Sequence, residues 1–228
     1  MKHLLFTLLA YFFANDNIIS YTADPAKQEI GFYWKDEKGQ VLRSIQNLKD
    51  HLGRKQQKLV FAANGGMYKT DNSPLGLFIQ DGKVIVPLNI LKGNGNFYLQ
   101  PNGVFYITTA NKALICTTSD FKQTGRIKLA TQSGPMLLIN GAIHPAFKKG
   151  SVNLNVRNGV GILPGNKVLF AMSKEPVNFY DFAEYFKSMG CMNALYLDGA
   201  VSRTYLPEKN WVQTDGDFGV MIGITVSN

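Results

Sequence analysis

Short hydrophobic runs separated by turn residues make up most of the chain, and this pattern predicts a protein built mainly of β-strands. The runs are short and end at Gly, Asn, Asp or Pro, which is typical of strands. The expected strands cover residues 30–34, 58–63, 75–79, 83–86, 97–99, 103–108, 113–117, 129–132, 136–139 and 193–197. Asp81-Gly82 and Asn140-Gly141 each separate two neighbouring runs, so we expect tight hairpins at both places.

Two segments carry apolar residues at helical spacing instead. Residues 45–53 predict a short helix, and residues 179–189 predict a clearer one, with Asn178 as its N-cap and Gly190 as its stop. Asp181 follows the cap by three residues, so we expect it to serve the cap rather than catalysis. No internal repeat or linker interrupts the chain. The sequence predicts a single α+β domain with a few helices and an extended β-sheet, mixed or antiparallel.

The N-terminal segment has the pattern of a secretory leader. Lys2 precedes an apolar stretch over residues 4–14, which is shorter than the roughly 20 residues that span a bilayer. We therefore predict a signal peptide over residues 1–20, a domain over residues 21–228, and export to the periplasm or the extracellular space. A buried first strand is the alternative, because no strong small-x-small cleavage site follows. Contact with a membrane is expected only through an uncleaved leader.

Composition narrows the classes of partner. The chain has 228 residues, of which 45% are hydrophobic and 18% charged, and its formal net charge is +8. The basic residues are scattered and no finger or RNP motif is present, so nucleic acid is not an expected partner, whereas a phosphorylated glycan suits the charge. Cys116 and Cys191 have no cluster of histidines around them. We expect two lone buried thiols, no metal site and no cofactor.

Asp198 is the strongest candidate for chemistry among the sixteen acidic residues. It ends the apolar run of residues 194–197 and precedes Gly199, so a buried strand would hold its carboxylate rigidly and partly out of water. Such a carboxylate suits a nucleophile, a base or a ligand-binding acid. An ordinary Asp-Gly turn is the alternative interpretation of the same residues.

Three other segments place polar groups or glycines at strand ends. Asn64-Gly65-Gly66 follows the expected strand at 58–63, and paired glycines allow a ligand to approach the backbone. Ser133-Gly134 could present a hydroxyl and free amides, with a plain turn as an equal alternative. Arg157-Asn158 lies in an apolar, glycine-rich stretch, where the guanidinium could clamp a phosphate or form a structural salt bridge, perhaps to Asp198.

His144 is a weaker candidate. It precedes Pro145, and packing or a loop is the ordinary role of such a histidine. It is retained as a candidate substrate-binding residue because histidine titrates near neutral pH.

Taken in order, these segments resemble the phosphodiester glycosidase family, over about residues 28–226, and most of all its small bacterial branch. The matching pieces are Asn64-Gly65-Gly66-Met67-Tyr68, Pro74-Leu75-Gly76-Leu77, Gln132-Ser133-Gly134-Pro135-Met136, Arg157-Asn158-Gly159-Val160-Gly161 and Leu197-Asp198-Gly199. The best-known member of this family removes N-acetylglucosamine to uncover mannose 6-phosphate. The resemblance implies hydrolysis of a sugar-1-phosphodiester at the anomeric carbon.

Under this resemblance Asp198 acts as nucleophile or base, while Arg157, Asn64 and Ser133 orient the diester. One carboxylate can suffice because a phosphate leaving group needs little protonation. The chain departs from the family after Gly199, where Ala200, Val201, Ser202 and Arg203 replace the usual Gly and Ser/Thr residues. Either the sugar or leaving group differs, or Arg203 adds a phosphate contact; Ser202 is a further candidate for substrate binding.

Three other functions remain open from the sequence. The first is a non-catalytic envelope module that binds anionic glycan or peptidoglycan in the same cleft. The second is a different hydrolase that acts on a phosphodiester or glycan bond, for example in cell-wall processing. The third is an interaction protein, which only the general stickiness of the surface favours.

Overall fold

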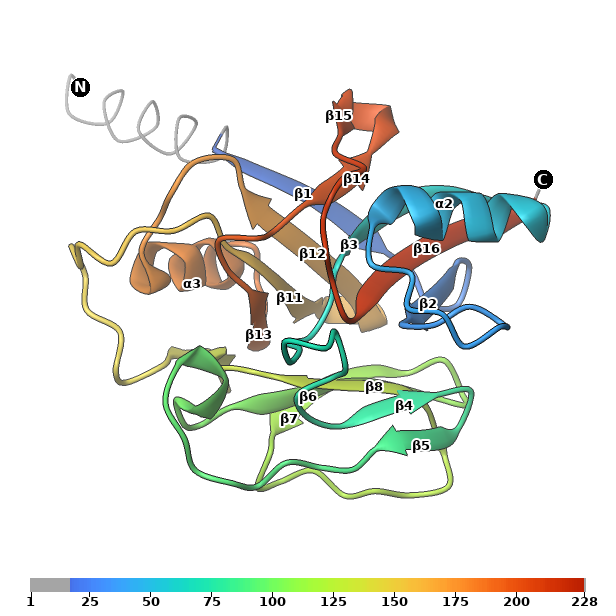
Figure 1. Cartoon of the computed structure of the whole chain (residues 1–228). Coiled ribbons are helices and arrows are strands. Elements are labelled where there is room, and N and C mark those ends of the chain that lie inside the picture. Colours follow the sequence, from blue (N-terminus) through green and yellow to red (C-terminus); the bar gives the residue numbers. More distant parts are fainter. Residues whose placement is uncertain (1–16, 228) are drawn as a thin grey trace.

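The computed structural model describes residues 17–227, and three antiparallel sheets form its framework (Figure 1). The six-stranded sheet has the order β1 (Ile18–Ala23), β12 (Lys167–Ser173), β11 (Asn158–Leu163), β13 (Asn193–Asp198), β9 (Met136–Ile139) and β10 (Ala142–Ile143). The β3 sheet has the order β15 (Trp211–Val212), β14 (Thr204–Leu206), β3 (Gln57–Asn64), β16 (Met221–Ser227) and β2 (Glu29–Tyr33). The β8 sheet has the order β5 (Lys83–Val86), β4 (Phe78–Gln80), β8 (Ile127–Ser133), β6 (Gly103–Thr108) and β7 (Ala113–Thr117).

The three sheets share one hydrophobic core. Phe170 of the six-stranded sheet lies 5.1 Å from Phe61 of the β3 sheet and 6.0 Å from Phe105 of the β8 sheet, measured between ring centroids. Phe32 of β2 adds a contact of 5.4 Å to Phe105. All four rings are buried. Because each aromatic pair contributes about 0.5–1.5 kcal/mol beyond the area it buries, this cluster fixes the sheets relative to one another.

Two α-helices cover outer faces of the sheets. Helix α2 (Ile45–Arg54) packs Leu48 and Leu52 against the β3 sheet, and α3 (Phe179–Ser188) packs Phe182 and Phe186 against the six-stranded sheet. Figure 1 shows both helices on the outside of the fold. Three short 3₁₀ segments, η1 (Asn96–Tyr98), η2 (Pro164–Asn166) and η3 (Pro207–Lys209), complete the elements.

The pattern of the sequence predicted most of these elements correctly. Helix α3 begins after Asn178, whose side chain accepts the N–H of Asp181 at 2.9 Å, as the capping argument required. Asp81 and Gly82, with φ of 50° and 76°, form the expected two-residue hairpin between β4 and β5. The expected α+β domain is predominantly β, and every strand pair among residues 17–227 is antiparallel.

Two of the expected strands differ from the structure. The strand expected at 97–99 is wrong, because η1 forms there and the side chain of Asn102 caps it by donating to the carbonyl of Phe97 at 2.8 Å. The strand expected at 75–79 begins only at Phe78. The N–H of Leu77 is already bonded to the side chain of Gln132 at 3.0 Å, so it cannot join a strand ladder.

The predicted leader falls mostly outside the described residues. Its last part is described, and Ile18, Ile19 and Ser20 belong to β1, which pairs with β12 along its whole length. A domain that began at residue 21 would lack the first half of this strand. No helix in the described part of the chain is both long and apolar enough to cross a membrane.

Candidate active site

Asp198 lies where β13 leaves the core. The strand is buried through Leu197, and the side chain of Asp198 is partly exposed at its end. A register shift between Asn158 and Gly159 pairs Asp198 with Asn158 on β11. The N–H of Asp198 donates to Oδ1 of Asn158 at 2.7 Å, so an amide side chain, rather than the ordinary strand ladder, holds the backbone of this residue.

Asn158 and Asn64 connect three strands and one turn at this point. Nδ2 of Asn158 donates to the carbonyl oxygen of Asn64 at 2.8 Å and to its Oδ1 at 3.1 Å. The same Oδ1 accepts the N–H of Arg203 at 3.0 Å. Both asparagines are buried. Two buried side chains therefore join the ends of β3, β11 and β13 and the turn at 199–203. The bonds between these two asparagines are buried and have little competition from water.

Two polar atoms at this junction make no geometrically good hydrogen bond in the part of the chain that the structure describes. They are Nδ2 of Asn64 and Oγ of Ser202, and both residues are buried. A buried polar group without a partner is costly and rare, and it often marks a place where a ligand or water binds. The turn itself is closed by the N–H of Ser202, which donates to the carbonyl of Gly199 at 2.7 Å.

The surroundings of Asp198 change its acidity. Burial raises the pKa of its carboxyl from 3.8 to about 6, while the N–H of Gly199, bonded to Oδ1 at 2.7 Å, and the side chain of Asn64 partly oppose that rise. No ion pair among residues 17–227 involves Asp198. Desolvation is thus the dominant effect, as expected for a carboxylate at the end of a buried strand.

Ser133 and the predicted glycines support this arrangement from behind. Oγ of Ser133 is fully buried and donates to the carbonyl of Leu197 at 2.8 Å, directly before Asp198. A Cβ at Gly66 would lie 2.3 Å from Oγ1 of Thr131, and one at Gly134 would lie 2.6 Å from Cβ of Asn102. The contacts that require these glycines are with protein. Ser133 therefore holds the strand end in this structure, and a direct role in binding substrate stays a prediction.

Arg157 is fully buried and bonds to protein groups on every side. Its Nε donates to the carbonyl of Val177 at 2.8 Å, and its guanidinium lies 3.6 Å from the ring centroid of Phe179. Another of its nitrogens donates to the carbonyl of Asn153 at 2.9 Å. The salt bridge to Asp198 considered above is not among the ion pairs of the described residues. Burial lowers the pKa of Arg157.

Arg157 nevertheless reaches the site through Tyr196. One guanidinium nitrogen donates to the Tyr196 hydroxyl at 3.4 Å, and that hydroxyl lies 2.4 Å from where a Cβ on Gly199 would stand. Gly199 is therefore required by close contact with Tyr196. In this structure Arg157 positions the turn after Asp198, and its direct contact with a phosphate remains a prediction.

His144 lies at the far end of the aromatic stack behind the site. It stacks on Phe147, which stacks on Phe179, which meets Tyr196 edge to face, with centroid distances of 4.7, 4.7 and 4.8 Å. Its Nδ1 accepts the N–H of Ala146 at 3.2 Å, and burial lowers its pKa. The structure gives His144 no contact with Asp198, so it packs behind the site, and the proposal that it binds substrate stays untested.

A cleft of about 450 Å³ opens beside the turn at 199–203. It is lined by Tyr68, Lys69, Thr70, Asn72, Ala200, Val201, Arg203, Gly216, Asp217 and Phe218. Burial, Asp198 and Asp217 together raise the pKa of Tyr68 to about 12, so the phenol stays neutral and can donate a hydrogen bond. Tyr68 and Lys69 were not singled out as site residues from the sequence, although Tyr68 closes the first quoted segment, and only the fold brings them beside the turn.

Arg203 lines the cleft but is already paired. Its Nε donates to both carboxylate oxygens of Asp215, at 2.9 and 3.0 Å, and a second nitrogen donates to the carbonyl of Ser202.

The described residues hold no group of three or more metal-ligating side chains, and Cys116 and Cys191 are free thiols. The chemistry available here is one partly desolvated carboxylate, two unpartnered donors and cations at the rim.

The raised pKa of Asp198 predicts a pH-dependent effect on stability. Its carboxyl contributes stability below pH 4 that is lost as the pH rises through about 6, because the folded protein must then hold a desolvated charge. Asp198→Asn should therefore be more stable than the wild type at pH 8, by roughly 1–3 kcal/mol, and equal to it near pH 4. Urea denaturation at both pH values measures this, with Asp50→Asn on the exposed face of α2 as the matched control. Equal stability of Asp198→Asn and the wild type at pH 8 would contradict the raised pKa of Asp198.

Comparison with known proteins places the chain in a family. The family model described as phosphodiester glycosidase matches residues 57–225. An uncharacterized protein of Escherichia coli (strain K12), YigE, is 37% identical over 188 residues, which cover 82% of this chain and 73% of the relative.

Solved structures agree in fold. The catalytic domain of zebrafish N-acetylglucosamine-1-phosphodiester alpha-N-acetylglucosaminidase, auto-inhibited by its pro-peptide, superimposes with a TM-score of 0.64 at 17% identity, covering 91% of this chain and 83% of that one. A hypothetical protein from Synechocystis gives a TM-score of 0.54 at 12% identity over 92% of this chain and 59% of that one. At these identities the likeness concerns the fold alone. The family match over residues 57–225, with the relative at 37% identity, establishes that this chain belongs to the phosphodiester glycosidase family.

Proposed function

We propose that the protein is an exported hydrolase that cleaves the glycosidic C–O bond of a sugar-1-phosphodiester in a glycan or envelope polymer. Membership of the family supports a hydrolase-type role. The observation that carries the proposal is the partly buried carboxylate of Asp198, which forms no ion pair within residues 17–227 and lies at the same junction as the polar side chains of Asn64 and Ser202.

The leaving group explains how one carboxylate can suffice. Ordinary glycosidases need a second carboxyl group to protonate an alkoxide. A phosphodiester releases a phosphate monoester, which leaves as a stable anion and needs stabilisation of charge instead. Lys69 at the rim of the cleft supplies a cation, and the neutral hydroxyl of Tyr68 supplies a hydrogen-bond donor.

The roles of the groups follow from their positions. Asp198 is ionised at neutral pH and acts at the anomeric carbon as nucleophile or as base toward water. The hydroxyl of Ser202 and the amide nitrogen of Asn64 bind the sugar or the phosphate, since neither makes a geometrically good hydrogen bond within residues 17–227. The Asn64 side chain also faces the carboxyl of Asp198 and lowers its pKa, so it contacts the substrate and the carboxylate together. Asn158 and Arg157 position this set from behind. The change from the family pattern at Ala200–Arg203 lies on the wall of the cleft, so it alters the part that receives the substrate.

Removal of the carboxylate tests the proposal directly. Asp198→Asn should lower kcat on a responsive sugar-1-phosphate methyl ester by a factor on the order of 10³ or more, because the step at the anomeric carbon loses its nucleophile or base. A panel of such esters that differ in the sugar identifies the substrate, and Asp50→Asn should keep wild-type turnover. Full activity of Asp198→Asn on that ester would sink the assignment.

Hydrolysis in ¹⁸O-labelled water identifies the bond that breaks. Label in the released sugar is the expected result, because water then attacks the anomeric carbon. Label in the phosphate would indicate phosphodiesterase chemistry instead. Saturable binding of the esters with no released sugar would favour the non-catalytic binding module.

The pH profile reports the protonation state that acts. Because a protonated Asp198 can serve neither as nucleophile nor as base, kcat/KM should fall roughly tenfold per pH unit below about 6 and reach a plateau above about 7. Stopped assays from pH 4 to 9 measure this profile. A rate that rises as the pH falls below 6 would show that the protonated carboxyl is the active form.

The leader pattern over residues 1–20 supports the part of the proposal that concerns export. Expression of the full chain in a Gram-negative host, followed by fractionation, should place it in the periplasm or the medium. Recovery of the intact chain in the cytoplasmic fraction alone would contradict export.

A further inference from the structure

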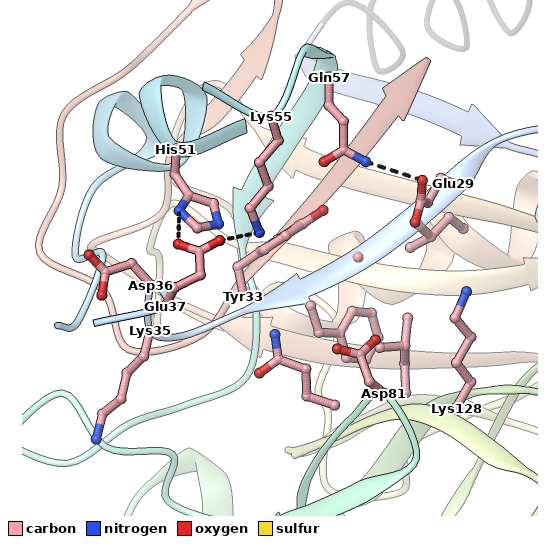
Figure 2. A pocket seen from close by; sticks show the side chains of 15 residues that line it. Glu29, Tyr33, Lys35, Asp36, Glu37, His51, Lys55, Gln57, Asp81 and Lys128 are labelled. Atoms are coloured by element: carbon pink, nitrogen blue, oxygen red, sulfur yellow. Dashed lines mark hydrogen bonds and ion pairs between the residues drawn. The ribbon is translucent and has the colours of Figure 1, made fainter. Parts of the chain in front are cut away.

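A second and larger hollow lies away from Asp198, along strand β2. Its volume is about 530 Å³, and all five residues of β2 line it (Figure 2). His51 and Lys55 at the end of α2 stand on one side of the strand in this view, and Asp81 of the β4–β5 hairpin stands on the other. A further hollow of about 280 Å³ shares Glu29, Ile30, Lys128 and Leu129 with it and continues toward residues 25–28. Together they form an elongated groove, which we name the β2 groove.

The backbone of β2 presents polar groups to this groove. Among the described strands, β2 is the last of its sheet and pairs with β16 alone. The N–H of Gly65 bonds to the carbonyl of Val220, which fixes which residues of β16 face β3. By the alternation of an antiparallel ladder, Ile222 faces β3, whereas Met221 and Gly223 face β2.

The same alternation decides the direction of each residue on β2. Gly31 and Tyr33 are the register partners of Gly223 and Met221, so their N–H and C=O groups are bonded to β16. The N–H and C=O groups of Ile30 and Phe32 therefore point outward, into the groove. The carbonyl of Trp34, next in this alternation, points the same way and accepts the N–H of Leu42 at 2.9 Å.

The outward groups of Ile30 and Phe32 have no hydrogen-bond partner within residues 17–227. Both residues line the hollow and are at most 5% exposed, so their backbone groups have little contact with water. A buried backbone group without a partner costs about 1–3 kcal/mol. Donors and acceptors that repeat at every second residue match the spacing of another extended polypeptide chain.

The charges around the groove select the kind of chain. Glu37 is paired with Lys55 and His51, and Asp36 accepts the N–H groups of its own turn. Glu29 and Asp81 have no basic partner in the described part of the chain, and both raise the pKa of the Tyr33 hydroxyl. Glu29 and Asp81 thus favour a basic side chain. Lys128, near Asp81 in Figure 2, and Lys35, whose Nζ lies 4.0 Å from the ring centroid of Trp34, favour carboxylates on the same chain.

We propose that the β2 groove binds an extended, lysine- or arginine-containing segment of a partner protein, which adds to the β3 sheet as a strand beside β2. The groove shares no residue with the cleft beside Asp198, so this binding is independent of the proposed function.

The test uses ¹⁵N-labelled full-length protein and the capped peptide acetyl-Thr-Val-Lys-Val-Thr-amide. Saturable shifts and slower hydrogen exchange are expected at the amides of Ile30 and Phe32, and Gly31, already bonded to β16, should change little. N-methylation of those peptide amides that face β2 should abolish binding, while N-methylation of the interleaved amides should preserve it. A peptide with Glu in place of Lys should bind more weakly.

Variants separate this site from the active site. Glu29→Gln combined with Asp81→Asn should weaken binding of the lysine peptide about five-fold, a loss of roughly 1 kcal/mol. Asp120→Asn combined with Glu208→Gln, which removes two exposed carboxylates elsewhere, should leave binding of the lysine peptide unchanged. Asp198→Asn should bind the peptide as the wild type does. No shift at Ile30 and Phe32 with millimolar peptide would overturn the proposal. Equal binding by both N-methylated forms, or shifts of these amides by maltotetraose and not by the peptide, would also overturn it.

Discussion

The amide side chain of Asn158 is the contact on which the rest of the site depends. It holds the backbone of Asp198 with its oxygen and both oxygens of Asn64 with its nitrogen, so it joins the six-stranded sheet to the β3 sheet. A strand ladder could not do this, because β3 and β13 belong to different sheets. The two bonds between Asn158 and Asn64 are buried, where loss of one partner leaves the other unsatisfied at a cost of about 1–3 kcal/mol. The position of the carboxylate is therefore coupled to the packing of two sheets.

This coupling allows the protein to keep a destabilising group in place. A carboxyl whose pKa is raised to about 6 opposes folding when it is ionised, and the buried hydroxyl of Ser202 has no hydrogen-bond partner within residues 17–227. The aromatic cluster where the three sheets meet and the stack from His144 to Tyr196 supply the stability that offsets these costs. A destabilising site supported by a well-packed core is common in proteins whose site binds a ligand.

Arg157 shows why residue type alone does not define a role. A guanidinium in a glycine-rich stretch suits phosphate binding, but here backbone carbonyls and the face of Phe179 surround it. It acts on the site through the hydroxyl of Tyr196, against which Gly199 packs. The larger hollow likewise lies along β2 rather than at Asp198. The volume of a hollow shows that a ligand has room to bind, whereas the polar groups without partners indicate the chemistry of that ligand.

The sequence alone determined the local elements and the family. The spacing of hydrophobic residues and the positions of turn residues predicted α2, α3, both hairpins and most strands, because these elements depend on neighbouring residues. The order of the strand-end segments identified the phosphodiester glycosidase family, to which the chain belongs. Asp198 was found because a carboxylate that ends an apolar run is visible in the sequence. Only the tertiary structure decided what surrounds it. The bonds from Asn158 to Asp198, from Asn158 to Asn64 and from Arg203 to Asn64 join residues that lie 40, 94 and 139 positions apart. No local pattern encodes such contacts, nor the burial of Arg157 or the place of Tyr68 on the cleft.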